Sequence, residues 1–130
     1  MSARPAKGAP SDNREDFDRV FAELRGILAP YASRLRVTRD KPGDYYLETR
    51  GPGPRKVPLM FAAVKTNKNY VSFHLMPIYV AAMGMSPALK KRMQGKACFN
   101  FTVVDRPLIE ELAALTSQGY DGWKKREWVD

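Results

Sequence analysis

Hydrophobic residues recur at helical spacing near the beginning of the chain. The apolar positions of this stretch are Phe17, Val20, Phe21, Leu24, Ile27 and Leu28. Residues three or four positions apart share one side of an α-helix, so the pattern predicts an amphipathic helix. Asp12 followed by Glu15 is a variant of the capping box, and Pro30 stops the pattern. We therefore expect a helix between Asp12 and Pro30 that lays one face on the core.

The spacing of apolar residues changes to two from Leu35 onward, which is the repeat of β-strands. The stretches that have this repeat, or are short apolar runs, are 35–38, 45–50, 57–65 and 70–76. Turn-forming residues separate them at 40–44, 51–54 and 66–69. The sequence therefore predicts four consecutive antiparallel strands. In the last of these, Phe73 faces one side of the sheet while Ser72 and His74 face the other.

Short helical elements are expected next, in the middle of the chain. Residues 78–83 suit one apolar helical turn. Ser86 followed by proline is typical of a helix start, because serine caps free amides and proline at the first position wastes no donor. This helix would carry Leu89 and Met93 inward and end at Gly95.

A fifth strand and a last helix complete the pattern. Phe99, Phe101 and Val103 alternate with smaller or polar residues, which predicts a short strand. Asp105 is a suitable N-cap for the helix that follows. The apolar stripe of that helix consists of Leu108, Ile109, Leu112 and Leu115. We expect the helix to end at Gly119.

This order of elements predicts an α+β fold, with a five-stranded antiparallel sheet and helices packed on one face. Residues 1–11 are expected to be a flexible tail, and residues 12–130 a single domain of ordinary size. The composition, 44% hydrophobic and 28% charged, is that of a soluble globular protein. No apolar run approaches the roughly 20 residues of a membrane span, so no membrane partner is expected. A single cysteine makes a reducing, cytoplasmic location the simplest assumption.

Positive charge is concentrated in the middle of the chain. The formal net charge is +8, yet residues 49–104 contain no Asp or Glu. The cations of this span are Arg50, Arg55, Lys56, Lys65, Lys68, Lys90, Lys91, Arg92 and Lys96. A local positive field attracts anions to one surface without specifying which anion binds. The charge pattern therefore predicts an anionic small molecule or an acidic protein surface as the partner.

The segment from Ser86 to Lys96 is the first candidate for a binding site. A helix N-terminus carries unpaired amides and a partial positive charge, which favour phosphate or carboxylate. Nearby cations would strengthen such a site, and they are Lys90, Lys91, Arg92 and Lys96. The alternative is that these cations stabilise the C-terminal end of their own helix and are otherwise solvated.

His74 is the second candidate, and it is the only histidine in the chain. If its side of the sheet opens to a cleft, His74 can act as a hydrogen-bond donor, an acid or a base, with Tyr79 and Lys65 as neighbours. No nucleophile or orienting carboxylate accompanies it, and Cys98 beside an aromatic residue is expected to be a small buried side chain. The sequence thus favours a binding domain over an enzyme, with no catalytic residue, metal ligand or cofactor assigned.

A resemblance to a known family is carried by the second half of the chain, from Leu59 to about Trp123. The pattern is a strand pair at 59–65 and 70–75, a lysine-rich stretch ending in Gly95-Lys96, an aromatic strand, and a helix opened by Pro107-Leu108. It resembles the YdhG-like family of domains of unknown function. The resemblance implies an α+β domain. Because some members have been linked to frataxin-like iron handling, it also implies iron binding as one candidate function.

Iron would require a cluster of oxygen ligands. Acidic residues do gather on the first predicted helix, at Asp12, Glu15, Asp16, Asp18 and Glu23. Arg14, Arg19 and Arg25 interleave with them, and a helix surface of mixed sign is usually only solvated.

Nucleic acid is the other alternative for a basic chain, because aromatic side chains on a basic sheet can stack on single strands. Aromatic residues on the predicted strands are Tyr45, Tyr46, Tyr70, Phe73 and Phe99. Whether Tyr46, Arg36 and Arg50 share the uncovered sheet face decides this hypothesis. No RNA-recognition motif, helix-turn-helix or zinc finger is present in the sequence. The favoured hypothesis is a small non-enzymatic domain that binds an anionic ligand or an acidic partner.

Overall fold

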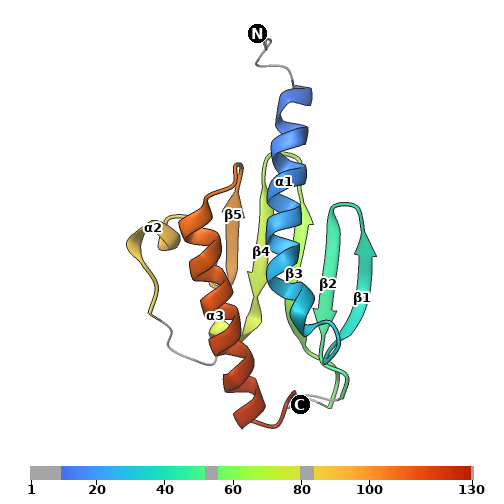
Figure 1. Cartoon of the computed structure of the whole chain (residues 1–130). Helices are drawn as coiled ribbons and strands as arrows, with labels where there is room; N and C mark the ends of the chain where they lie inside the picture. The colour runs from blue at the N-terminus through green and yellow to red at the C-terminus, as the bar shows by residue number, and fades with distance from the viewer. Residues whose placement is uncertain (1–9, 52–55, 80–83, 130) are drawn as a thin grey trace.

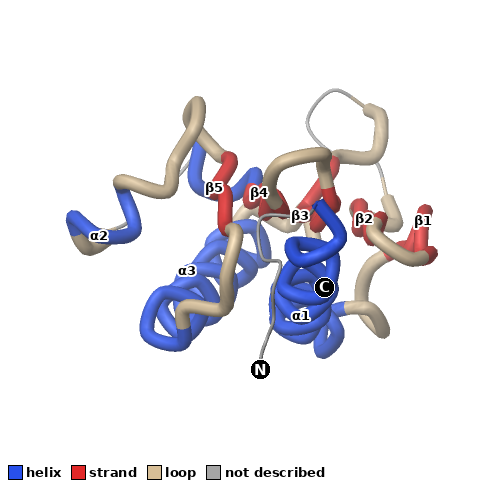
Figure 2. The backbone as a smooth tube through the Cα atoms, turned by 90° about the horizontal axis from the view of Figure 1, so that it is seen from above, coloured by secondary structure: helices blue, strands red, loops and turns tan. Residues whose placement is uncertain are grey.

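The structure is a computed structural model that describes residues 10–51, 56–79 and 84–129. Five strands form one antiparallel sheet in the order of the sequence: β1 (Arg36–Lys41), β2 (Asp44–Glu48), β3 (Met60–Thr66), β4 (Val71–Leu75) and β5 (Cys98–Phe101). Two long helices, α1 (Pro10–Leu28) and α3 (Arg106–Lys125), lie side by side on one face of the sheet (Figure 1, Figure 2). The predicted α+β fold with helices on one face is confirmed.

Helix α1 buries the apolar stripe that the sequence predicts. Its buried residues are Phe17, Val20, Leu24 and Leu28. The helix begins at Pro10, two residues before the expected cap at Asp12. Proline is favoured in the first turn, because its missing N–H would have no partner there. Asp12 therefore lies within the helix and is not its N-cap.

The first two strands form the expected hairpin, with only Pro42 and Gly43 between them. Gly43 has a φ of +77°, a conformation that side chains with a Cβ rarely adopt. Its carbonyl accepts a hydrogen bond of 2.8 Å from the N–H of Thr66 at the end of β3. The turn is thereby attached to the neighbouring strand.

The middle helix is much shorter than the sequence predicts. Helix α2 (Pro87–Lys90) is a single turn and does not reach Gly95. The chain then runs beside β5, where the carbonyl of Arg92 accepts from the N–H of Asn100, and the N–H of Gln94 donates to the carbonyl of Cys98. These bonds satisfy the free edge of β5, which offsets the hydrogen bonds that a longer helix would have made. Leu89 is buried as expected.

The last two elements also depart from their expected limits. Strand β5 ends at Phe101, so Val103 lies beyond it and is 51% exposed. Helix α3 continues to Lys125, past the expected end at Gly119, because its buried stripe continues through Tyr120 and Trp123. The predicted cap is present, since the N–H of Leu108 donates to Asp105 Oδ1 over 3.3 Å. A short 3-10 helix, η2 (Met76–Tyr79), follows β4, whereas residues 80–83 of the expected turn lie outside the described residues.

The core lies between the sheet and the two long helices. It is formed on the sheet side by alternate residues such as Tyr45, Leu47, Val64, Phe73 and Phe99. Side chains along a strand alternate between the two faces, so the residues between these point away from the helices. In Figure 2 both long helices lie below the strands, and no helix of the described chain lies above the strands β1 to β3, on the second face. We call it the open sheet face.

Candidate anion site on the open sheet face

Two rows of side chains cross the open sheet face from strand to strand. In the first row the paired residues are Arg39, Tyr46, Ala63, His74 and Cys98. In the second row they are Lys41, Asp44, Lys65, Ser72 and Asn100. Opposite residues on neighbouring strands have their Cβ atoms about 5 Å apart, so members of a row contact one another. The antiparallel register therefore brings cations of β1 and β3 and the imidazole of β4 toward one place.

A hollow of about 150 Å³ lies beside these two rows and is lined by residues of both. Its lining residues are Arg39, Asp44, Tyr46, Met60, Ala63, Lys65 and His74. The small side chain of Ala63 leaves the space open, because it stands between the larger side chains of Tyr46 and His74 in the same row. The hollow thus has a small apolar floor with polar groups around it.

Arg39 is held in a fixed position at one wall of the hollow. Its Nε lies 3.0 and 2.9 Å from the two carboxylate oxygens of Asp44. The guanidinium carbon also lies 4.4 Å from the ring centroid of Tyr46, which is a cation–π contact. The Nε–H is occupied by Asp44, so the terminal N–H groups are the donors that remain for a ligand.

His74 forms part of the opposite wall and is half-buried. Burial lowers the pKa of His74 below its ordinary value of 6.5, because the charged imidazolium loses hydration. The imidazole is therefore neutral at pH 7 and offers one N–H donor. Lys65, by contrast, is exposed, and its ammonium group makes no ion pair with any described residue.

The structure separates the residues that the sequence analysis grouped as ligand-binding. His74 lines the hollow together with Lys65, its expected neighbour. Tyr79 lies at the end of η2, and its side chain is outside the described part of the structure. The other predicted residues lie beyond β5, in and after α2.

Ser86 already binds a carboxylate of the same chain. Its hydroxyl donates to Glu111 Oε1 and its N–H donates to Glu111 Oε2, each over 2.7 Å. The same hydroxyl accepts from the N–H of Leu89 over 3.1 Å, as an N-cap does. Glu111 of α3 thus occupies the donors that were expected to receive an anion.

The predicted cations of this segment, Lys90, Lys91, Arg92 and Lys96, are all exposed. Lys90 is the last residue of α2, and the other three follow that helix, in the segment beside the outer edge of β5. Strand β5 stands between them and β4, which carries His74. They therefore lie outside the hollow and do not line it.

Two residues of the hollow, Arg39 and Asp44, were not expected at a site. The sequence placed Asp44 in a turn, and Arg39 just before it. The hairpin could have indicated the position of Arg39 from the sequence. A two-residue turn at Pro42 and Gly43 sets Arg39 across from β2. Their position next to His74 follows from the sheet order, which the sequence does not determine alone.

The aromatic residues proposed for nucleic-acid stacking are mostly in the core. Tyr45, Phe73 and Phe99 are buried. Tyr46 does share the open face with Arg36, but its ring is covered by a guanidinium group. The side chain of Arg50 donates to the carbonyl of Ser33 over 2.5 Å, near the end of α1. The open face therefore offers little free aromatic surface for stacked bases.

The described residues contain no group of three or more His, Cys, Asp or Glu side chains that could hold a metal ion. Within the acidic set of α1, Glu23 is bound to Arg106 over 2.6 Å. Cys98 is half-buried, and burial raises the pKa of its thiol, which disfavours the reactive thiolate. Iron binding and the YdhG-like assignment remain predictions from the resemblance.

No family model, curated protein or solved structure matches this chain. Among the helices in the described ranges, none has both the length and the apolar character needed to cross a membrane. The open sheet face is therefore the feature from which a function can be inferred.

Proposed function

We propose that this protein is a small non-enzymatic binding domain whose open sheet face receives one anionic group. The hollow lined by Arg39, Lys65 and His74 is the observation that carries the proposal. These side chains belong to three different strands and offer donors from several directions. A carboxylate or phosphate oxygen needs such converging donors, because it loses hydration when it binds.

The charge balance of the hollow supports an anion as the ligand. Asp44 offsets one of the two permanent cations, because it is bound to Arg39. Lys65 keeps its charge uncompensated among the described residues, and His74 adds a neutral donor. The arrangement has a net positive charge and a polar rim, which fits an anion better than a cation or an apolar molecule.

The size of the hollow restricts what it can hold. Its volume of about 150 Å³ is well below the range of roughly 300–1,000 Å³ that is usual for drug-sized ligands. The hollow fits a single carboxylate or phosphate group with a short body. Such a group can belong to a small metabolite or to an acidic side chain of a partner protein.

The cations beside β5 have a separate part in this proposal. They are exposed and lie in the acid-free half of the chain, so their field extends beyond the hollow. Fields of this kind raise the rate at which anions arrive and weaken with added salt. Lys90, Lys91, Arg92 and Lys96 would therefore speed association more than they would hold the bound ligand.

The proposal is tested by titrating the protein with inorganic phosphate and with acetate at about 50 mM salt. Because the chain has one histidine, the imidazole signals in an NMR spectrum report on His74 without ambiguity. We expect a saturable shift of these signals in the wild-type protein. Lys65→Ala should weaken binding at least about tenfold, since a hydrogen bond to a charged group contributes about 1.5–3 kcal/mol.

Lys124→Ala is the matched control, because it removes an exposed lysine from the end of α3, away from the open sheet face. It should leave the phosphate and acetate affinities unchanged. The proposal fails if neither anion shifts the His74 signals, or if the two lysine variants weaken binding equally.

Salt separates this proposal from nucleic-acid binding. A pocket for one anionic group should lose affinity gradually with salt, whereas an oligonucleotide that contacts several phosphates should lose it steeply. Labelled single-stranded oligonucleotides at about 50 and 200 mM salt provide the comparison. Tight oligonucleotide binding that collapses at the higher salt would favour the nucleic-acid alternative.

A further inference from the structure

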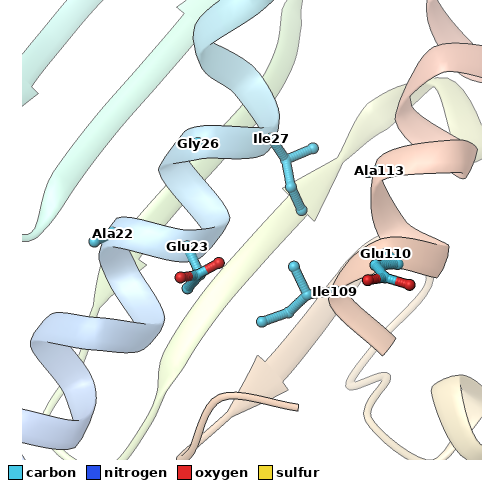
Figure 3. A pocket seen from close by; sticks show the side chains of 7 residues that line it. All are labelled: Ala22, Glu23, Gly26, Ile27, Ile109, Glu110 and Ala113. Carbon is cyan, nitrogen blue, oxygen red and sulfur yellow. The ribbon is translucent and has the colours of Figure 1, made fainter. Parts of the chain in front are cut away.

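A groove runs between the two long helices, on the side of the molecule opposite to the open sheet face. Its volume is about 410 Å³, within the usual range of ligand pockets. Its lining residues are Ala22, Glu23, Gly26, Ile27, Ile109, Glu110 and Ala113. Figure 3 shows the side chains of Ile27 and Ile109 pointing into the space between α1 and α3. The floor of the groove is therefore apolar.

Gly26 contributes to the width of this groove. A Cβ at this position would meet no heavy atom within 4 Å, so packing inside the chain does not require glycine there. Glycine inside a helix is unfavourable by about 1 kcal/mol relative to alanine. The position has space for a larger residue, and this space is part of the groove, where a bound helix could occupy it.

The two walls of the groove carry carboxylates. Glu23 projects from α1 and Glu110 from α3, and both are drawn beside the apolar floor in Figure 3. Glu23 is bound to Arg106, whose hydrogen bond lowers the pKa of the Glu23 carboxyl. Glu110 makes no ion pair within 4.0 Å of its carboxylate with any residue that the structure describes. Two carboxylates against the one guanidinium of Arg106 leave the rim with a net charge of −1, in a protein of net charge +8.

We propose that the groove between α1 and α3 docks an amphipathic helix of another protein, with apolar residues on its inner side and a Lys or Arg beside Glu110. An added helix packs readily into the valley between two others, because side-chain ridges fit into grooves. Ile27 and Ile109 would contact its apolar side. Charge complementarity selects a basic helix as the occupant.

A second copy of this chain is a poorer occupant. Two grooves brought face to face would set Glu23 and Glu110 of one copy against the same residues of the other. Like charges disfavour that contact, and the net charge of +8 on each chain adds to the repulsion. The groove is therefore assigned to a different protein.

The proposal is tested with a labelled synthetic peptide of leucine and lysine, about 18 residues long, which makes about five helical turns. A peptide with the same leucines, and glutamate in place of lysine, is the charge control. We expect saturable binding of the lysine peptide by fluorescence anisotropy at about 150 mM salt. The glutamate peptide should bind at least about tenfold more weakly.

Variants of the groove locate the binding. Gly26→Leu should weaken the lysine peptide about tenfold or more, because its side chain fills the groove. Gly26→Ala is the matched control and should bind almost as well as the wild-type protein. Glu110→Lys reverses an exposed charge without touching the core, so it tests the same contact even if Gly26→Leu fails to fold.

Four results would overturn the proposal. These are no binding of the lysine peptide to the wild-type protein, equal binding of both peptides, binding that neither Gly26→Leu nor Glu110→Lys weakens, and sedimentation showing a dimer that Glu110→Lys abolishes. The groove is independent of the anion site, because its residues belong to the helices and those of the hollow belong to the sheet. Either proposal can therefore fail alone.

Discussion

His74 connects the chemistry of the hollow with the stability of the fold. Burial disfavours its charged form, so the pKa of His74 in the folded protein lies below the ordinary value of 6.5. The unfolded chain then takes up the proton first as the pH falls. Protonation of this residue therefore opposes folding, and the effect begins as the pH drops below about 6.5.

This gives a prediction for pH. From pH 7.5 to pH 5, the wild-type protein should lose more free energy of unfolding than His74→Gln, because the variant has no imidazole to protonate. Urea unfolding of both proteins at the two pH values measures the difference. An NMR titration of the imidazole with a midpoint above 6.5 would contradict the reasoning.

Two glycines with different surroundings give a second prediction. Gly43→Ala should lower the free energy of unfolding by about 1 kcal/mol or more, since φ at this turn is +77° and a Cβ would lie 3.4 Å from that of Thr66. Gly26→Ala should raise it by up to about 1 kcal/mol, because it lies in a helix with no atom near the added methyl group. Thermal unfolding followed by circular dichroism measures both. A loss of stability in Gly26→Ala would show that the helix needs glycine for another reason.

Among the elements, α2 depends on α3 for its position. It is one turn long, too short to be stable alone, and the carboxylate of Glu111 binds both the hydroxyl and the N–H of Ser86 at its start. This contact between Glu111 and Ser86 fixes the position from which the chain enters the segment that pairs with β5. The cations beside β5 are thus positioned through a bond to a helix that follows them in sequence.

The contribution of the contact between Glu111 and Ser86 to stability can be tested by Glu111→Gln. The variant replaces a charged acceptor by a neutral one and should cost about 1–3 kcal/mol in the free energy of unfolding by urea. Glu110→Gln, on the exposed neighbouring residue, should change it by less than about 0.5 kcal/mol. Equal effects of the two substitutions would show that the contact with Ser86 does not stabilise the fold.

The sequence predicts the elements well where a periodic pattern has no competing partner. The repeats of α1 and of β4 identify these elements, because apolar spacing decides which side is buried. Prediction from the sequence fails for α2, because Arg92 and Gln94 pair with β5. Local helix propensity does not predict such a pairing. The sequence prediction also ends α3 too early at Gly119, where packing of the following turn outweighs the low helix propensity of glycine.

The residues of the candidate site were likewise predicted where a local pattern places them, and missed where contacts between distant residues do. His74 and Lys65 were expected on one side of their strands, and alternation along a strand is a local property. Arg39 and Asp44 join them only through the pairing of β2 with β3, which depends on the complete sheet. Ser86 was expected to be free for a ligand, and nothing near it in sequence indicates the contact with Glu111.

At the scale of the whole molecule, an aromatic cluster joins the helices to the sheet. Phe61 of β3 lies 5.7 Å from the ring of Tyr31, 5.7 Å from that of Tyr120 and 5.5 Å from that of Trp123. Trp128 lies 5.5 Å from Trp123 and covers it after the end of α3. Such tilted and edge-to-face pairs add to the stabilisation from burial.

Removing Trp123 from this cluster should destabilise the whole fold. Trp123→Ala should lower the free energy of unfolding by about 3–5 kcal/mol, because the side chain is 3% exposed and a cavity would remain. Trp128→Ala should cost less, since that residue is only partly buried. Guanidinium unfolding followed by circular dichroism measures both. Equal losses would mean that the end of the chain contributes as much as the core.

The pairing of residues 92–94 with β5 also bears on how the protein behaves at high concentration. A sheet can recruit strands from other chains at any unpaired edge, and this pairing protects the β5 edge. The opposite edge is β1, whose residues are all exposed. There the register shift after Val37 and the charges of Arg36, Arg39 and Lys41 oppose the addition of a further strand. The sheet should therefore resist edge-to-edge aggregation even though one of its faces is not covered by helices.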